Sequence, residues 1–472
     1  MNKRRPTLKL KSLRQMQAIR SGVARLGAQA CAVADRIAEL AEPGMREFKS
    51  SALLEDFLAT NGFRVSRPWR NLPTAFKAVA RIGGKTSRAT GPTIALLAEY
   101  DALPDCGQRP GRWGHGCGHN LLGAGAALAG VVAAQVLRRT GLAARIVVFG
   151  CPAEEMLSGK VYMAAGRAFA GLGAVLAWHP AGETRVNAAG GAAMDSILLR
   201  FRGRTAHAAS AHGGRSALDA AMLTDVAINY LREHVESNVR IHGIITEGGK
   251  APNVVPDAAE SWYYVRGKDR KQVDELRGRV LRCARGAATA TETSARMIVK
   301  DCVTERIRNK TLAEMLDALL RRWGAPRFSP ADARAAAKVL PKKKYCTKIV
   351  AIKDDASTAS SDEDNVSWFA PLNCVNVACV PVGVTGHHRN WAGMCRISGA
   401  HRGLRRAAEV LAAAAVELVL NRPLLRKALA EFRKNRRGRK YGLPISPAVM
   451  RRLGSTRTPQ AGRDAGDSGD GD

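Results

Sequence analysis

Several features that would assign a protein to a class are missing or scarce in this sequence. It has no run of 18 apolar residues, which argues against a membrane-spanning helix. The basic N-terminal segment has no apolar core and so is not a secretory signal, although an organellar targeting peptide stays open because no acidic residue precedes Asp35. The ten cysteines follow no framework spacing. This argues against a disulfide scaffold and favours a reduced, cytoplasmic compartment.

Acidic residues are few relative to basic ones, and the formal net charge is +33. Much of the excess lies between Arg422 and Arg452, and such a segment could bind nucleic acid or an anionic surface. However, aromatic residues make up only 5% of the chain, and no recognisable nucleic-acid-binding motif accompanies the charge. An arginine-rich composition with a solvated tail is the simpler explanation. We therefore expect no membrane partner and regard a nucleic-acid partner as a secondary hypothesis.

The chain of 472 residues is too long for one compact core, so two domains are expected. In the first part, short apolar runs typical of buried parallel strands alternate with helical segments at 14–62 and 121–139. These runs are Thr93–Ala98, Arg145–Gly150 and Ala174–Trp178. Such alternation predicts a doubly wound sheet whose ligands gather at the carboxyl ends of the strands.

The pattern changes after about residue 190. Half-exposed strands at 196–201, 239–245 and 260–265 are separated by helices at 216–232 and 270–288, which predicts an antiparallel sheet in an α+β insert. A helix at 312–323, a strand at 374–380 and a helix at 402–420 then return to the first domain. The predicted fold class is therefore α/β: a mostly parallel-sheet catalytic domain with an inserted α+β lid or dimerisation domain. The predicted division is catalytic domain 1–190 and 301–430, lid 191–300, and a basic, then disordered tail 431–472.

Four clusters of potential metal ligands each follow a predicted strand. Cys117 and His119 lie in the glycine-rich loop GHGCGHN, and a thiolate and an imidazole are good ligands for zinc or a similar ion. The other clusters are Glu154-Glu155 in CPAEE, His179 in WHP, and His387-His388 after Gly386. Any one of them alone is more simply a packed or surface residue. Because the fold brings the strand ends together, the four clusters jointly predict a metal site, with one glutamate binding metal and the other moving a proton.

Longer motifs in the chain resemble the di-metal aminoacylase and carboxypeptidase family. The similarity runs in order from about residue 35 to 420, and it is strongest to the p-aminobenzoyl-glutamate hydrolase branch and its aminoacylase and indole-acetyl-amino-acid hydrolase relatives. The motifs are AEYDALP (98–104), GHGCGHN (114–120), CPAEE (151–155), SGK (158–160), WHP (178–180), GRTAHAA (203–209), GRSALDA (214–220) and APNVVP (251–256).

The resemblance implies a role for individual residues. The metal ligands are expected at Cys117, His119, Glu155, His179 and His387. Glu154 is expected to be the general base that activates water, and Asp101 to orient a histidine ligand from outside the ligand set. His387 is preferred to its neighbour His388 by counting back from Ser398-Gly-Ala-His401, which resembles the start of the family's closing helix.

On the insert, the resemblance implies that His207 reaches the site of a neighbouring subunit and polarises the scissile carbonyl. Asn253 and Arg266 are expected to bind the substrate carboxylate, for which a guanidinium group is well shaped. These implications predict two divalent metal ions per chain, Mn or Zn, and a homodimer or a heteromer with a related subunit. The expected substrate is a small amide with a carboxylate: p-aminobenzoyl-glutamate-like, an N-acyl amino acid or a dipeptide.

The sequence departs from the family pattern in two places. Met156 and Leu157 stand where two glycines usually follow the glutamates, and SSDEDNVSW (360–368) replaces STDVGDVSW, so that Asp364 takes the place of a glycine and Asn365 of an aspartate. Because the proposed ligands and base remain, we predict a metal-dependent amidohydrolase. The altered loop leaves open an alternative, a weakly active or inactive binding or regulatory protein on the same metal-binding scaffold.

Overall fold

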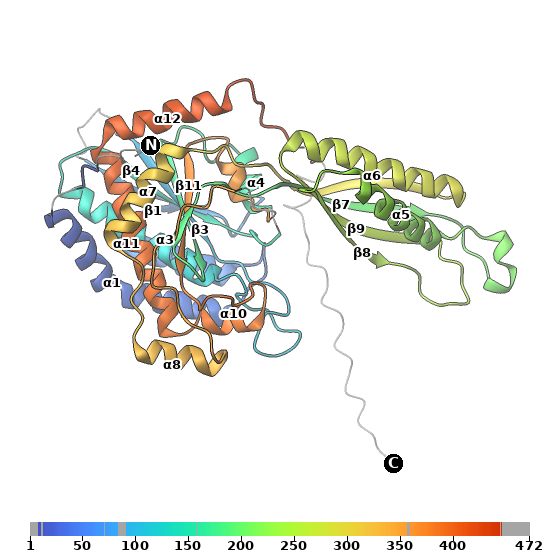
Figure 1. Ribbon diagram of the computed structural model, residues 1–472, viewed down its shortest axis with the longest axis horizontal. Helices are drawn as coiled ribbons and strands as arrows, with labels where there is room; N and C mark the ends of the chain where they lie inside the picture. Colours follow the sequence, from blue (N-terminus) through green and yellow to red (C-terminus); the bar gives the residue numbers. More distant parts are fainter. Residues whose placement is uncertain are drawn as a thin grey trace, which may run out of the picture.

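The computed structural model describes residues 8–10, 13–69, 71–83, 91–156, 158–355, 359–443 and 445. They form a large α/β domain and a smaller α+β domain that extends to one side of it (Figure 1). Two neighbouring chain segments join the domains, one before β7 (Ala193–Arg202) and one after β10 (Ser294–Val303). The predicted fold class is confirmed.

The large domain is built on a seven-stranded sheet in the order β1-β2-β4-β3-β5-β11-β6. Its centre consists of four mutually parallel strands, β4 (Ala144–Cys151), β3 (Thr93–Glu99), β5 (Ala174–Ala181) and β11 (Leu372–Ala378). The flanking strands β1 (Arg64–Ser66), β2 (Phe76–Ile82) and β6 (Arg185–Asn187) pair antiparallel. The carboxyl ends of the central strands therefore lie along one edge, as the sequence predicts.

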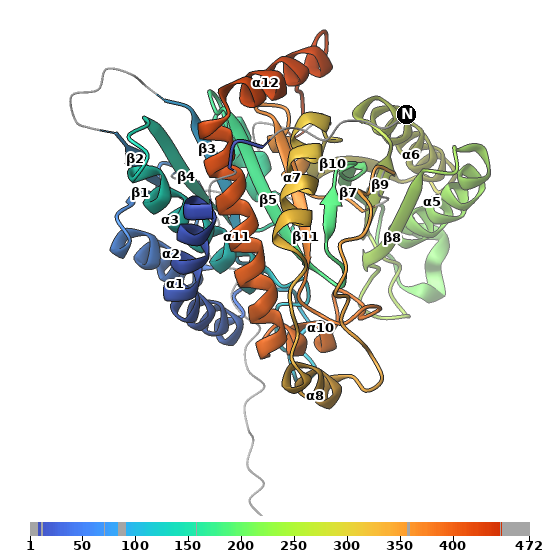
Figure 2. The same cartoon turned by 60° about the vertical axis from the view of Figure 1, so that its left-hand side comes forward.

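Both faces of this sheet are buried, which explains why its strands are continuous apolar runs. In β3, Ile94 and Leu96 join the larger core cluster, whereas Ala95 and Leu97 join a second cluster on the opposite face. The larger core lies beneath α3 (His119–Arg138), α7 (Lys310–Trp323) and α11 (Ser398–Leu420), with α1 (Leu13–Leu40) packed outside them (Figure 2). The opposite face carries α4 (Gly159–Ala165) and α9 (Glu363–Val366).

Helix α3 is long and apolar enough to cross a membrane by length and composition, but 94% of its most apolar window is buried inside the domain. It starts at Gly118, whose φ of +83° is a left-handed conformation that favours glycine. A Cβ there would also lie 3.1 Å from the Pro180 side chain. This glycine turns the chain between Cys117 and His119, so both side chains face the strand ends.

The small domain has a four-stranded antiparallel sheet in the order β10-β7-β9-β8, with β8 at Arg240–Glu247 and β9 at Ala258–Gly267. Helices α5 (Ala217–Leu231) and α6 (Arg270–Ala290) cover one face of it. Side-chain caps start both helices: Ser216 accepts from the Asp219 amide, and Asp269 accepts from the Gln272 amide. The structure also has two short 3₁₀ turns here, Ala208–Gly213 and Arg232–His234.

Three boundaries differ from the sequence prediction. The helical stretch predicted at 14–62 is two helices, because residues 41–47 turn the chain between α1 and α2 (Phe48–Thr60), with Ala41 and Met45 at positive φ. The predicted boundary at 300 falls inside β10. The predicted tail boundary at 431 falls inside α12 (Arg422–Arg436), whose apolar face packs on the domain. Helices α8 (Pro330–Val339) and α10 (Arg389–Met394) complete the fold.

Candidate metal centre and active site

The predicted metal ligands converge from four chain segments at the carboxyl edge of the central strands. Cys117 and His119 lie at the start of α3, Glu155 follows β4, His179 is near the end of β5, and His387 lies in the loop after β11. These segments meet because β3 pairs in parallel with β4 and β5, and β5 pairs in parallel with β11. The sequence alone could place each ligand at a strand end. The pairing of the strands brings them together.

Two ligand triads share the thiol of Cys117. In the first, Cys117, His119 and His179 offer ligand atoms within 4.8 Å of one another, and the Cys117 Sγ lies 3.3 Å from the His179 Nε2. In the second, Cys117 is grouped with Glu155 and His387 within the same limit. A thiolate with imidazoles and a carboxylate is a donor set that suits zinc and similar borderline ions. The arrangement has the form of two adjacent metal positions with one common ligand.

The structure distinguishes between the two neighbouring histidines. His387 Nε2 lies 3.5 Å from Glu155 Oε2, and the His387 amide donates to the Gly116 carbonyl over 2.8 Å. The ring of His388 instead caps α10, where its Nδ1 accepts from the Asn390 amide. His387 adopts a φ of +56°, a conformation that is uncommon outside glycine and that concentrates at functional sites.

Asp101 contacts both the ring of His119 and the backbone of Glu155. Its Oδ1 lies 2.8 Å from His119 Nδ1, and its Oδ2 accepts from the Glu155 amide over 2.9 Å. Burial favours a higher pKa for Asp101, but the neighbouring His119 keeps it below the ordinary value. Asp101 thereby fixes the orientation of the His119 ring and leaves Nε2 directed at the site.

Two of the potential ligand atoms lack a hydrogen-bond partner in the described part of the protein, as expected for atoms that bind a cation. Among the described residues, His119 Nε2 and Glu155 Oε1 are buried and make no hydrogen bond. Burial, together with the charge of Glu154, raises the pKa of Glu155 to about 8, and burial and the neighbouring His119 lower that of His179 to about 4. The lowered pKa keeps His179 in the neutral form that binds metal, whereas a bound divalent ion would favour the ionised form of Glu155 and would give the unpartnered atoms a ligand bond.

Glu154 lies beside the triads. Its Oε2 is 3.8 Å from His119 Nε2, and its Oε1 accepts from the hydroxyl of Ser361 over 2.7 Å. Burial first, and the nearby Glu99 second, raise its pKa. A buried carboxyl with a raised pKa, next to the ligand triads, has the properties of a general base.

Sequence reasoning missed a group of charged residues behind Glu154. Lys160 is fully buried, and its ammonium group contacts Glu99 Oε1 at 2.9 Å and the carboxylate of Asp362. Glu99 Oε2 also lies 3.4 Å from His119 Nε2. Glu99 and Lys160 belong to the motifs AEYDALP and SGK, so a buried charge within an otherwise apolar strand was the available signal.

The small domain carries the other three predicted site residues. Among the described contacts, none joins His207 or Asn253 to a predicted ligand. Both are exposed, and the Nδ1 of His207 accepts from the Ala209 amide. Arg266 is half-buried on β9 with its guanidinium 5.7 Å from the ring centre of Tyr264. This chain by itself does not bring His207 to the metal centre.

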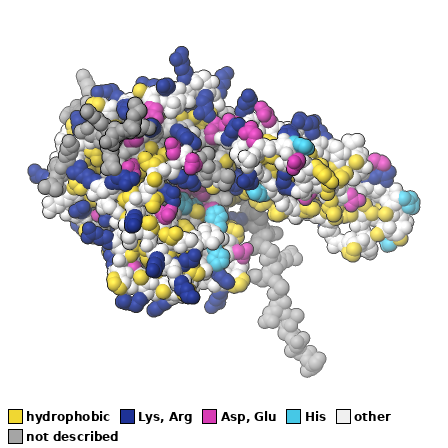
Figure 3. Space-filling view, viewed as in Figure 1, with side chains coloured by type: hydrophobic (Ala, Val, Ile, Leu, Met, Phe, Trp, Pro, Cys, Tyr) yellow, Lys and Arg dark blue, Asp and Glu magenta, His cyan; other side chains and the backbone are white. Residues whose placement is uncertain are grey.

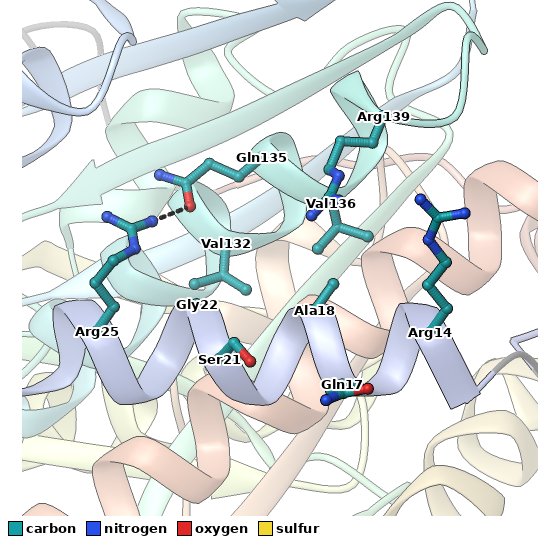
Figure 4. Close-up of a pocket in the computed structure, with 10 residues that line it drawn as sticks. All are labelled: Arg14, Gln17, Ala18, Ser21, Gly22, Arg25, Val132, Gln135, Val136 and Arg139. Carbon is teal, nitrogen blue, oxygen red and sulfur yellow. Dashed lines mark hydrogen bonds between the residues drawn. The ribbon is translucent and has the colours of Figure 1, made fainter.

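A hollow elsewhere on the surface has a different chemistry. A groove of about 410 Å³ lies between α1 and α3, where Arg14, Arg25 and Arg139 line its walls and Arg25 donates to Gln135 (Figure 4). Its lining contains no carboxylate, thiol or imidazole, so it lacks the groups that hydrolysis requires. Figure 3 shows Lys and Arg side chains scattered over the visible face, and histidine side chains beside the recess next to the small domain.

The fold and the grouped ligand side chains point to a class of protein, the metal-dependent hydrolases. The model of the peptidase dimerisation domain of the M20 peptidases matches residues 190–291. One of the subunits of p-aminobenzoyl-glutamate hydrolase from Escherichia coli (strain K12) is 33% identical over 462 residues, which cover 88% of this chain and 94% of that protein. The Xaa-Arg dipeptidase of Homo sapiens is 34% identical over 61% of this chain and 65% of its own length.

Solved structures agree on the fold. A dinuclear metal-binding peptidase from the M20 family of Bacillus subtilis superposes with a TM-score of 0.55 at 19% identity, covering 84% of this chain and 99% of that one. An aminobenzoyl-glutamate utilization protein from Klebsiella pneumoniae gives a TM-score of 0.55 at 18% identity, covering 84% and 96%. The identity to the Escherichia coli subunit and the match to the dimerisation domain show that the chain belongs to the M20 family of metal-dependent peptidases and amidohydrolases. It is a metal-dependent amidohydrolase.

Proposed function

We propose that this enzyme hydrolyses an amide bond adjacent to a carboxylate in a small molecule. The observation that carries the proposal is the position of Glu154, buried beside two ligand triads that share Cys117. The names of the relatives suggest p-aminobenzoyl-glutamate-like compounds, N-acyl amino acids or dipeptides as the substrate class. A purely binding or regulatory role has less support, because the general base candidate is retained.

Two divalent ions, Mn or Zn, are proposed for the two triads. Cys117, His119 and His179 would hold one, and Cys117, Glu155 and His387 the other. Asp101 would orient His119 through the bond to Nδ1. When bound, such ions lower the pKa of water and polarise a carbonyl oxygen.

Glu154 would move the proton. Its carboxylate, held at Oε1 by Ser361, takes a proton from the attacking water and returns it to the amine that leaves. The buried setting excludes competing solvent and raises the basicity that the step needs. Glu155, one residue further on, would act as a ligand and carry no proton.

The lid would complete the site from another subunit. We propose that residues 191–303 form this lid and that His207 of a neighbouring subunit polarises the scissile carbonyl, which fits its exposure and its separation from the metal centre in this chain. Asn253 and Arg266 would bind the substrate carboxylate. The partner would be a second copy of the chain or a related, different chain, since the relative from Escherichia coli is named as one of the subunits of its hydrolase.

The cytoplasm is the proposed location. All ten cysteines lie in the described part of the chain and all are free, as a reducing compartment would maintain them.

The test is hydrolysis by the purified chain of p-aminobenzoyl-glutamate, N-acyl amino acids and dipeptides, after metal removal and after loading with Mn²⁺ or Zn²⁺. We expect metal-dependent release of the amino acid, and substrates amidated at the carboxylate should be poor. The absence of hydrolysis across the set in fully metal-loaded, dimeric protein would count against the proposal. Activity that remains after metal removal would count against it as well.

A further inference from the structure

The loop at 359–367, where the sequence departs from the family pattern, contacts the chain segment that enters the lid. The Ala192 amide donates to the Ala359 carbonyl over 2.8 Å, and the Gly191 amide donates to Asp364 Oδ2 over 2.6 Å. A Cβ on Gly191 would lie 2.6 Å from the Ala359 carbonyl oxygen, so only glycine allows the loop this close. Asp364 occupies the place of a usual glycine and supplies the acceptor.

The same loop also contacts the segment that returns from the lid. Arg306 donates from Nε to Asp364 Oδ1 over 2.5 Å and pairs with Glu363. The Thr304 amide donates to Asn365 Oδ1 over 3.2 Å. Asp364 thus accepts one hydrogen bond from each of the two connections, which run side by side between the domains in Figure 1. The loop is the point where both connections meet the catalytic domain.

The other end of the loop reaches the proposed base. Ser361 donates its hydroxyl hydrogen to Glu154 Oε1 over 2.7 Å and accepts from the Glu363 amide over 3.1 Å. The amide fixes the position of the hydroxyl, and the hydroxyl fixes the carboxylate. Next to it, Asp362 accepts from the Lys160 amide over 2.7 Å and pairs with its buried ammonium group, which anchors the loop to α4.

We propose that Ser361 is a positioning residue for Glu154 and that Asp364 makes this positioning depend on the two connections between the domains. The inference rests on the proposed role of Glu154 as the base. The hydrogen bond to Oε1 directs Oε2 toward His119 and the metal centre. Because Asp364 accepts hydrogen bonds from both connections, the position of the loop, and with it that of Ser361, depends on where the two connections lie.

The first experiment compares three serine variants in the metal-loaded enzyme. Ser361→Ala should lower kcat roughly tenfold, as expected for a lost hydrogen bond to a charged group, while KM and metal content stay unchanged. Ser361→Thr keeps the hydroxyl and should restore most of kcat. Ser360→Ala is the matched control, because the Ser360 hydroxyl is buried and makes no hydrogen bond among the described residues. Equal kcat in Ser361→Ala and Ser360→Ala would overturn the positioning role, as would a Thr variant no better than Ala.

The second experiment is a double-mutant cycle on kcat with Asp364→Gly, which restores the usual family residue. Asp364→Gly alone should lower kcat several-fold, and it should have almost no further effect in the Ser361→Ala background, because both changes act through the same contact. Additive effects would overturn the link to the connections. If Asp364→Gly does not fold, Asp364→Asn takes its place in the same cycle. It keeps one acceptor oxygen for the two donors.

The variant Glu154→Gln distinguishes a failure of the proposed base from a failure of the positioning role of Ser361. If that variant retains full activity, the proposed function of Glu154 fails and the inference fails with it. If Glu154→Gln is inactive but Ser361→Ala matches the unaltered enzyme, only the inference fails.

Discussion

The catalytic domain and the lid differ in whether their predicted site residues meet one another within this chain. In the catalytic domain, the predicted ligands and the base candidate contact one another within one chain, and the charged residues behind them are paired. In the lid, His207 and Asn253 project without contact to the metal centre among the described residues. The first site is assembled by intramolecular packing. The proposed role of His207 and Asn253 therefore depends on a neighbouring subunit.

The lid also exposes large apolar side chains on β8 and α5. β8 is the edge strand of the small sheet, and its Ile244 is 61% exposed. On α5, Met222, Val226 and Tyr230 are 54%, 49% and 76% exposed. An open edge strand beside exposed large apolar side chains is typical of an interface, because both are liabilities on an isolated molecule. These side chains give the lid an apolar surface that a partner could cover.

Loss of the ligand that both triads share should have the largest effect on activity and metal content. Cys117→Ala removes the thiol common to both triads, so activity should fall to background and metal content should drop by more than in His179→Ala, which affects one triad. Inductively coupled plasma mass spectrometry on purified protein measures this difference. Full metal content in both variants would refute the assignment of the ligands.

Variants of Glu154 and Glu155 test which of the two moves the proton and which binds metal. Glu154→Gln should keep fold and metal while kcat falls by roughly 10²–10⁴-fold, the usual contribution of a general acid–base group. Glu155→Gln should lose metal as well as rate. A Glu154→Gln enzyme that works at the normal rate would exclude this residue as the base. Metal loss in Glu154→Gln with retention in Glu155→Gln would reverse the two roles.

Mixing two inactive variants tests whether the lid of one subunit completes the catalytic site of another. Mixing inactive His207→Ala with inactive Glu154→Gln should recover up to about a quarter of the activity at equal amounts, because half of the dimers are hybrids and each hybrid has one complete site. The control pair, Cys117→Ala with Glu154→Gln, alters residues on the same side and should recover none. Verified subunit exchange without recovered activity would show that the site is not shared between chains.

A charge placed on the lid surface should separate the subunits with a smaller effect on the fold. Tyr230→Asp puts a carboxylate on an exposed apolar face and should shift the dimer toward monomer in analytical ultracentrifugation. The melting temperature of the catalytic domain should change little. Arg81→Asp, at the exposed position of β2 in the catalytic domain, serves as the surface-charge control. An unchanged dimer in Tyr230→Asp would place the interface elsewhere.

Metal removal should produce the smallest effect, a pH-dependent change in stability. Without metal, burial raises the pKa of Glu155 and of Glu47 to about 8, from an ordinary value of 4.5 that the unfolded chain retains. The folded state then favours the protonated carboxyls, but the lowered pKa of His179 offsets this effect up to its ordinary value of 6.5, so the metal-free protein loses stability as pH rises from about 6.5 to about 8. Metal binding needs ionised Glu155 and opposes that loss. The gap in Tm between loaded and metal-free protein should widen over this range in calorimetry, and a constant gap would contradict the argument.

Much of the fold and many of the candidate ligands could be predicted, because both follow from patterns among residues that are close in the sequence. Apolar runs of strand length gave β3, β4 and β5 within a few residues, and the ligand types Cys117, His119 and His179 followed from their chemistry at strand ends. The break between α1 and α2 was missed although Pro43-Gly44 signals it, because a proline and a glycine side by side favour a turn and end a helix. The short strand β6 and helix α9 were too brief to leave a periodic signal.

The sequence by itself determined the order and type of the main elements and the chemistry available at each strand end, because helix and strand periods and ligand preferences depend on neighbouring residues. Only the tertiary structure decided that Ser361 meets Glu154, 207 residues away, and that Lys160 meets Asp362. It also decided that Asp364 joins both connections to the lid. Such contacts depend on how the sheet orders its strands and how loops pack over it, and no local pattern encodes a distance between residues so far apart in the chain.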